Sequence, residues 1–199
     1  MTGPPVIGLL GGIGSGKSAV AGILDSLGCV VSDADRHVHE VLADPAVLSR
    51  LRERWGSTVL DARGGADRAA IASIVFEDDA ERRWLEEIVH PLVSSMREEL
   101  FAAGPDAPAH VIDAPLIIEA GLADECDLLV FIDTPLGVRR DRVSRTRGWD
   151  PEELDRRERA QASVAEKKAA ADVILHNLED ESALRAEVAR MLSEAIGSR

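Results

Sequence analysis

A glycine-rich turn between an apolar run and an amphipathic segment constrains the fold of this chain more than any other feature. The run Val6–Leu10 is short and apolar, as a buried parallel strand is. It leads directly into Gly11–Gly16, which has the sequence Gly-Gly-Ile-Gly-Ser-Gly. From Ser18 to Leu27, apolar side chains recur at helical spacing, and Gly28 can end that helix. A strand, a tight turn and a helix in this order predict the start of a parallel α/β sheet.

The rest of the chain continues the alternation of strands and helices. Further short apolar runs predict strands at Cys29–Val31, Ala109–Ile112, Leu128–Ile132 and Val173–Leu175. Helical patterns cover approximately Pro45–Trp55, Asp79–Ala102, Leu136–Thr146, Pro151–Ala171 and Ser182–Ile196. Strands separated by helices predict the α/β class, with a parallel sheet of about five strands flanked by helices.

We expect one domain over residues 1–199, because this length suits a single core. The long stretch after the second strand has no convincing strand and predicts an inserted helical subdomain at about 34–103, with the turn Asp61–Gly65 inside it. The sheet core is then expected at about 1–33, 104–138 and 172–199. The segment at about 139–171 remains, and its helical pattern and the arginines described below make us expect a helical lid there.

The glycine turn also predicts a chemistry. Residues 11–18 match the pattern G-x-x-x-x-G-K-[ST] of a P-loop, in the strand-to-helix context that this pattern requires. Glycines let successive backbone N–H groups surround phosphate oxygens, and the helix N-terminus adds partial positive charge. We therefore expect a loop that binds the phosphates of ATP through Gly12, Ile13, Gly14, Ser15, Gly16, Lys17 and Ser18. Lys17 would reach the β- and γ-phosphates, and the Ser18 hydroxyl would be a ligand of Mg²⁺.

The alternative for this loop is a flexible glycine turn with a solvent-exposed lysine. Lys17 is the only lysine in the first 166 residues, which favours a specific role. A GTPase switch is disfavoured, since it needs an N-K-x-D segment and a D-x-x-G segment after a strand. The segments that follow the predicted strands are instead Asp113-Ala-Pro-Leu and Asp133-Thr-Pro-Leu.

The charge balance narrows the possible partners. The chain has 23 Lys and Arg against 36 Asp and Glu, a formal net charge of −13. Nucleic acids and anionic membranes are bound through many basic contacts, so we expect neither, whereas a small phosphorylated substrate needs only a local positive pocket. We see no membrane-spanning stretch and no secretory signal, and Cys29 and Cys126 form no metal-ligand or disulfide pattern. A cytoplasmic enzyme, monomeric or weakly oligomeric, fits best.

Two aspartates end strands, where an open parallel sheet places its ligands. Asp33 follows the second strand, and its carboxylate can accept the proton of an attacking hydroxyl. It can equally cap the helix expected from Ala34. Asp113 ends the third strand and can hold Mg²⁺ through water, or cap a loop. The residues alone leave both alternatives open.

Arginines are concentrated between residues 139 and 147. Arg139, Arg140, Arg142, Arg145 and Arg147 stand against Asp141 alone, a local charge of 5 − 1 = +4 in an acidic chain. This cluster favours a lid that closes over ATP and screens the transferring phosphoryl group. The alternative is a solvated helix face with i,i+4 ion pairs to the acidic residues that follow.

His90-Pro91 is by itself more typical of a helix break with a hydrogen-bonded histidine than of a binding site. Trp55, Trp84 and Trp149 are expected to pack rather than to serve as stacking platforms.

Together these residues make the chain resemble the dephospho-CoA kinase family over essentially its whole length. The segments on which the resemblance rests are, in order, Gly8–Ser18, Ser32–Asp35, Arg68 with Ile71, Val75-Phe76, Leu85–Pro91, Ile112–Leu116, Glu119–Leu122, Arg157 with Gln161, Glu166-Lys167, Ala171-Asp172 and Asn177. The P-loop alone is generic, but this ordered series is specific.

The resemblance implies ATP-dependent phosphorylation of the ribose 3′-hydroxyl of dephospho-CoA, the last step of coenzyme A synthesis. It implies a nucleotide-kinase-like P-loop core, a helical CoA-binding subdomain and an arginine-bearing lid. Asp33 would be the base and Lys17 would bind the phosphates. The residues expected on the acceptor side are Asp33, Arg68, His90, Asp113 and Arg157.

The chain departs from the family pattern at two positions. Ala19 stands where a threonine usually follows the P-loop serine, and Thr146 stands where the lid usually has an arginine. Among the lid arginines, we expect Arg140 to act in catalysis and Arg147 to bind the nucleotide. A different nucleotide or small-molecule kinase and a non-enzymatic P-loop binding module are the alternatives in other classes.

Overall fold

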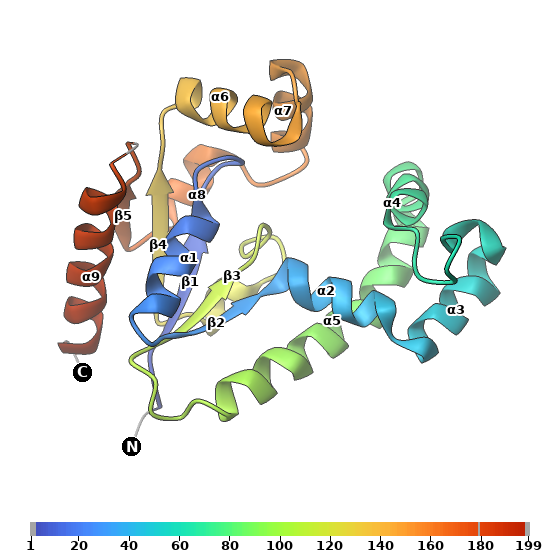
Figure 1. Ribbon diagram of the computed structural model, residues 1–199, viewed down its shortest axis with the longest axis horizontal. Coiled ribbons are helices and arrows are strands. Elements are labelled where there is room, and N and C mark those ends of the chain that lie inside the picture. Colours follow the sequence, from blue (N-terminus) through green and yellow to red (C-terminus); the bar gives the residue numbers. More distant parts are fainter. Residues whose placement is uncertain (1–2, 179, 198–199) are drawn as a thin grey trace. The chain divides into compact units, whose positions relative to one another are not determined.

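The computed structural model describes residues 3–178 and 180–197, and it contains a five-stranded parallel sheet (Figure 1). The strands lie in the order β2-β3-β1-β4-β5. Their bounds are β1 (Val6–Leu10), β2 (Val30–Asp33), β3 (His110–Asp113), β4 (Leu128–Asp133) and β5 (Val173–His176). Neighbouring strands pair in parallel throughout. The α/β fold class predicted from the sequence is confirmed.

The chain divides into two compact units. One comprises Met1–Asp33 and Ala103–Arg199, and the other comprises Ala34–Ala102. The first unit contains the sheet and the helices α1 (Lys17–Ser26), η2 (Leu122–Glu125), α6 (Leu136–Arg147), α7 (Pro151–Glu158), α8 (Val164–Ala169) and α9 (Glu181–Gly197). The second unit contains α2 (Ala34–Ala43), α3 (Pro45–Trp55), η1 (Gly56–Val59), α4 (Arg68–Glu77) and α5 (Asp79–Ala102).

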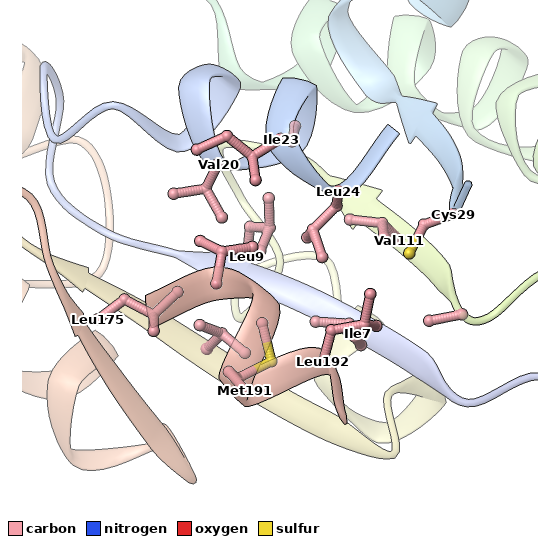
Figure 2. Close-up of a cluster of buried hydrophobic side chains, with 14 of the residues drawn as sticks. Ile7, Leu9, Val20, Ile23, Leu24, Cys29, Val111, Leu175, Met191 and Leu192 are labelled. Carbon is pink, nitrogen blue, oxygen red and sulfur yellow. The ribbon is translucent and has the colours of Figure 1, made fainter. Parts of the chain in front are cut away.

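The core of the first unit lies between one face of the sheet and the helices α1 and α9. Figure 2 shows side chains of alternate residues on β1, Ile7 and Leu9, that meet Leu24 of α1 and Leu192 of α9. The alternation follows from the two-residue period of a strand, which sends every second side chain to one face. This layer fixes α1 against β1, and the loop that joins them is therefore held at both ends.

The opposite face of the sheet is covered by the segment that follows β3. A Cβ on Gly8 of β1 would lie 2.7 Å from Cys126 Sγ and 2.9 Å from Leu129 Cδ2. Ile117 and Phe131 are almost fully buried on this side of the core. A glycine is required at position 8 because any side chain there would displace this cover.

The second unit has its own hydrophobic cluster, built from helices alone. Its centre includes Val41, Leu51, Val59 and Ile71, all buried. The turn predicted at Asp61–Gly65 is present: the Asp61 carboxylate accepts hydrogen bonds from the N–H groups of Arg63 and Gly65, at 2.8 and 2.9 Å. Helices fill the remainder, as expected for this region.

Two of the expectations about helices are contradicted by the structure. The single helix expected over Pro151–Ala171 is wrong, since α7 and α8 are separate and Ser163 starts a new helix with a capping box to Glu166. The helix break expected at His90-Pro91 is also wrong, because α5 continues through Pro91. Proline leaves one carbonyl oxygen four residues earlier without its helical donor, but buried side chains at Ile88 and Val89 hold the helix to its unit.

Helix α4 was not delimited by the sequence pattern. Its apolar residues are distributed around the helix rather than along one stripe, so they have no helical period, and only Ile71 is buried. Among the described residues, 3–178 and 180–197, no helix combines the length and apolarity needed to cross a membrane.

We expect Leu24→Ala to lower the free energy of unfolding by about 2–5 kcal/mol, because Leu24 is fully buried between α1 and the sheet and truncation leaves a cavity. Chemical denaturation followed by circular dichroism measures the change. Leu178→Ala is the matched control, since this leucine is 62% exposed, and it should shift stability by less than about 0.5 kcal/mol. Equal effects of the two variants would contradict this account of the core.

Candidate active site

The loop between β1 and α1 presents backbone rather than side chains. Gly14 and Gly16 have φ angles of 77° and 93°, a region that L-residues rarely adopt. Gly16 is the N-cap residue of α1 and provides no side-chain cap to the first turn. The first N–H groups of a helix have no partners within it, and the helix dipole makes this end positive. The start of α1 is therefore suited to an anion, as the P-loop motif predicts.

Two glycines of the loop are also required by close packing. A Cβ on Gly16 would lie 2.2 Å from Asn177 Nδ2, and one on Gly12 would lie 2.6 Å from Arg139 Nη1. Both distances are shorter than nonbonded contacts allow. The loop is thus enclosed by α6 and by the residue after β5, and only bare backbone leaves room for them.

The carbonyl oxygen of Ser15 fixes the conformation of the loop. It accepts hydrogen bonds from Asn177 Nδ2 at 2.8 Å, Thr134 Oγ1 at 2.9 Å and Arg142 Nη1 at 3.3 Å. Arg142 Nη2 also donates to Asn177 Oδ1 at 3.1 Å, which fixes the orientation of the amide. Sequence reasoning named Asn177 only within the family resemblance and gave Thr134 no role. Their positions directly after the ends of β5 and β4 are the only sequence signal that could have indicated them.

The two P-loop side chains predicted to act on ATP differ in exposure. Lys17 is half-buried, and its Nζ donates to the carbonyl oxygen of Gly11 at 3.4 Å. Ser18 is exposed in the first turn of α1. The ammonium group therefore lies over the loop, at the end of the helix that attracts anions.

Aspartates end three strands of the sheet, β2, β3 and β4. The register of β2 and β3 pairs Asp33 directly with Asp113, so their side chains project from the same face at the carboxyl edge. Asp33 is followed at once by α2, so its position suits both a base and a helix cap. Asp133 ends β4, and its carboxylate accepts a hydrogen bond from Lys168 Nζ at 2.7 Å.

Two of the arginines predicted for a lid, Arg140 and Arg157, are paired with carboxylates of α7. Arg140 Nη2 lies 3.3 Å from Asp155 Oδ1, and Arg157 Nε lies 2.5 Å from Glu153 Oε1. Arg157 and its neighbour Arg156 hold the pKa of Glu153 below its usual range through these hydrogen bonds. Arg157 and Glu153 form an i,i+4 pair within α7, whereas Arg140 reaches from α6 to Asp155 of α7.

Trp149 lies between two of the predicted site residues. The guanidinium carbon of Arg157 is 4.3 Å from the centre of the Trp149 ring, and that of Arg147 is 4.8 Å from it. Contacts at this distance are attractive because the cation meets the negative face of the ring. The expectation that Trp149 would only pack did not foresee this role in holding two arginines.

Arg139, a neighbour of these residues on α6, contacts the P-loop itself. Its Nη1 donates to the carbonyl oxygen of Ile13 at 3.2 Å and makes a short ion pair with Glu158. Glu158 in turn accepts a hydrogen bond from the Ile13 N–H at 3.1 Å. From the sequence, Arg139 is only one of a cluster of arginines, and Glu158 is one of the acidic residues that follow it.

A buried lysine joins the segment after β3 to the segment between α7 and α8. Lys167 is 2% exposed, and its Nζ donates to Gln161 Oε1 at 2.8 Å and to the Pro115 carbonyl oxygen at 3.3 Å. Glu119 Oε1 lies 3.9 Å away and accepts the Ala162 N–H at 2.6 Å. Burial lowers the pKa of Lys167, and the nearby carboxylates of Glu119 and Glu158 oppose this shift.

The remaining predicted residues, Arg68 and His90, belong to the second unit. Arg68 is the first residue of α4, which Asp67 caps by accepting hydrogen bonds from the N–H groups of Ala69 and Ala70. Both Arg68 and His90 are exposed. The P-loop, the paired aspartates and the lid arginines all belong to the first unit.

We expect Asn177→Asp to weaken ATP binding about fivefold or more, because the aspartate can still accept from Arg142 but can no longer donate to the Ser15 carbonyl oxygen. Isothermal titration calorimetry with ATP measures the effect. His176→Asn changes the exposed preceding residue and serves as the control. Unchanged ATP affinity in Asn177→Asp would show that this contact does not position the loop.

Comparison with known proteins agrees with this geometry. The family model described as dephospho-CoA kinase matches residues 5–182. A dephospho-CoA kinase from Thermobifida fusca (strain YX) is 40% identical over 190 residues, which cover 94% of each chain.

Two solved structures extend the comparison. A Thermus thermophilus protein has a crystal structure that superposes with a TM-score of 0.85 at 33% identity, covering 97% of this chain and 98% of that one. The dephospho-CoA kinase from Campylobacter jejuni shares the fold, with a TM-score of 0.63 at 22% identity over 96% of this chain and 97% of that one. From the family match and the close relative, the chain belongs to the dephospho-CoA kinase family.

Proposed function

We propose that the site transfers the γ-phosphoryl group of ATP to the ribose 3′-hydroxyl of dephospho-CoA, with Asp33 as the base and Lys17 on the phosphates. The family makes the chain an ATP-dependent kinase that phosphorylates dephospho-CoA in coenzyme A biosynthesis. The single observation that supports the residue assignment is the common edge of the sheet. β1 leads into the P-loop there, and β2 and β3 end there in the paired Asp33 and Asp113.

The P-loop provides the phosphate site. The backbone N–H groups of residues 12–18 would surround the phosphate oxygens of ATP, as the glycine conformations permit. Lys17, which lies over the loop, would stabilise the charge that develops on the transferring group.

Mg²⁺ fits the donors present at this edge. The Ser18 hydroxyl and the Asp113 carboxylate are oxygen ligands, which this ion prefers, and it usually completes its shell with water and substrate phosphates. Within residues 3–178 and 180–197, no three His, Cys, Asp or Glu side chains form a metal cluster. The ion would neutralise phosphate charge when it arrives with ATP, with Ser18 as its direct ligand and Asp113 beside it.

Asp33 is suited to the acceptor side of the reaction. Its carboxylate can take the proton of the attacking 3′-hydroxyl, which raises the nucleophilicity of that oxygen. Asp113, its partner in register, is expected to orient the substrate or the ion on the same face.

The lid arginines are expected to meet the phosphates from the other side of the nucleotide. Arg140 and Arg147 lie on α6, and Arg157 lies on α7. Guanidinium groups make paired, charge-assisted hydrogen bonds to phosphate oxygens. Arg140 would then stabilise the transferring phosphoryl group. Arg147 would bind the nucleotide, and Arg157 would bind the substrate.

The second unit is expected to bind the rest of the acceptor. Dephospho-CoA has a pyrophosphate and a long pantetheine arm beyond its adenosine, and a P-loop core has no room for all of these. Arg68 and His90 are exposed on helices of the second unit and are the proposed contacts. With a net charge of −13, we further expect a monomer or weak oligomer in the cytoplasm that acts on small molecules, and neither nucleic acid nor membrane as a partner.

The function itself is tested by incubating the purified chain with ATP, Mg²⁺ and dephospho-CoA and detecting CoA and ADP by mass spectrometry. We expect a preference for dephospho-CoA over AMP or adenosine of several orders of magnitude in kcat/KM. Equal or better activity on AMP would show a kinase with a different acceptor.

We expect Asp33→Asn to lower kcat by about 10²–10⁴-fold with little change in ATP affinity, because the amide keeps the shape and an oxygen but cannot accept the proton. Steady-state kinetics and ATP titration measure the two quantities. If the variant instead loses thermal stability and keeps its turnover, Asp33 is a helix cap and not the base.

We expect Arg68→Ala to raise KM for dephospho-CoA by about tenfold and to leave KM for ATP nearly unchanged, because the guanidinium is proposed to bind a phosphate of the acceptor. Arg63→Ala removes the same charge from an exposed position five residues earlier and is the control. A defect of Arg68→Ala confined to ATP would contradict the acceptor role.

A further inference from the structure

A carboxylate from α7 occupies the outer part of the P-loop. Glu158 Oε1 accepts the Ile13 N–H at 3.1 Å, and a Cβ on Gly12 would lie 2.9 Å from the same oxygen. Glu158 is the last residue of α7, where a negative charge meets the negative end of the helix dipole. The helix dipole therefore disfavours the charge of Glu158. The partners of this carboxylate on the loop explain why it lies there.

Arg139 is the second partner of this carboxylate. Its side chain is only 7% exposed, and its Nη1 contacts both Glu158 and the carbonyl oxygen of Ile13. A buried guanidinium requires an anion close by, because an unpaired buried charge is strongly destabilising. An N–H group of the loop and a buried arginine thus share one anion site, which Glu158 fills.

Both donors of this anion site are of the kinds that bind phosphate. Backbone N–H groups of a glycine loop and guanidinium groups are the usual partners of phosphate oxygens. Ile13 lies four residues before Lys17, at the end of the loop remote from the start of α1. The start of α1 is suited to the inner phosphates. Lys17 Nζ reaches back to the Gly11 carbonyl oxygen, toward the Ile13 end of the loop, so the γ-phosphate that Lys17 is expected to bind lies toward that end.

We propose that Glu158 stands in for the terminal phosphate of ATP, and that Arg139 is a further phosphate-binding residue that exchanges Glu158 for this phosphate. The inference rests on the proposed function, since it requires ATP on the P-loop. The two anions cannot share the site, because they repel each other and use the same donors. Binding of ATP therefore requires Glu158 to withdraw, and the affinity of the free protein for ATP is lowered by this competition.

A purely structural ion pair predicts the opposite result. If Glu158 only holds α7 to the loop, removing its charge loosens the site and leaves ATP affinity unchanged or weaker. If it competes with phosphate, removing its charge strengthens ATP binding. The sign of the change in affinity decides between the two.

The test measures the dissociation constants of ATP and ADP by titration calorimetry for the wild type, Glu158→Gln and Glu158→Ala. We expect both variants to bind ATP about fivefold tighter or more, and ADP with little change. Without nucleotide, Glu158→Gln should also melt at a lower temperature than the wild type, because Arg139 has lost its counter-ion. Bound ATP should abolish this difference in melting temperature. The glutamine variant preserves the shape of the side chain, so the result stands even if the alanine variant folds poorly.

Glu152→Gln is the matched control, because it removes the same charge from an exposed position on the same helix. It should leave both affinities unchanged. Unchanged or weaker ATP binding by Glu158→Gln overturns the proposal, and so does an equal gain for ATP and ADP. A wild-type chain that binds no ATP would instead refute the proposed function, which separates the two failures.

Arg139→Gln tests the other half of the exchange. We expect it to weaken ATP binding about fivefold or more, and ADP binding less, because only the terminal phosphate replaces Glu158 at this guanidinium. Arg159→Gln, at an exposed position directly after α7, is the control for lost positive charge, and it should leave both affinities unchanged. An equal loss of affinity for ATP and ADP would show that Arg139 does not bind the terminal phosphate.

Discussion

The close packing of bare P-loop backbone against α6 and the end of β5 is the constraint on which the site depends. At Gly12 and Gly16 there is no room for a side chain, because Arg139 and Asn177 fill the space. The same approach lets three donors reach the carbonyl oxygen of Ser15. A rigid loop keeps its N–H groups aimed at an anion before one arrives, so little conformational entropy remains to be lost when ATP binds.

This packing also explains how an acidic chain keeps a cluster of arginines beside its nucleotide site. Three of these arginines, Arg139, Arg140 and Arg157, are paired with carboxylates of α7, at Glu158, Asp155 and Glu153 respectively. Phosphate groups would compete with these carboxylates for the same guanidinium groups. The helices that are expected to form the lid are therefore held by internal ion pairs, and a nucleotide can replace some of them.

Several residues of the family series have an explanation only in three dimensions. Glu119 lies far from Gln161 and Lys167 in the sequence, but all three meet around the buried ammonium group of Lys167. Through the Pro115 carbonyl oxygen, this group also holds the segment that follows Asp113. The position of Asp113 at the sheet edge is thus supported by a contact from α8.

The sequence by itself determined the parallel sheet, the P-loop and most helices, because these depend on local periodicity and short-range glycine geometry. The bounds of β1, α3 and α5 follow the pattern residue by residue. Tertiary structure decided the break between α7 and α8, where the Glu119 carboxylate accepts a hydrogen bond from the Ala162 N–H. It also decided the partners of Arg139 and Asn177, which lie more than 120 residues from the P-loop atoms that they contact. No local pattern encodes such pairs, since they form only when the sheet brings the ends of distant strands to one edge.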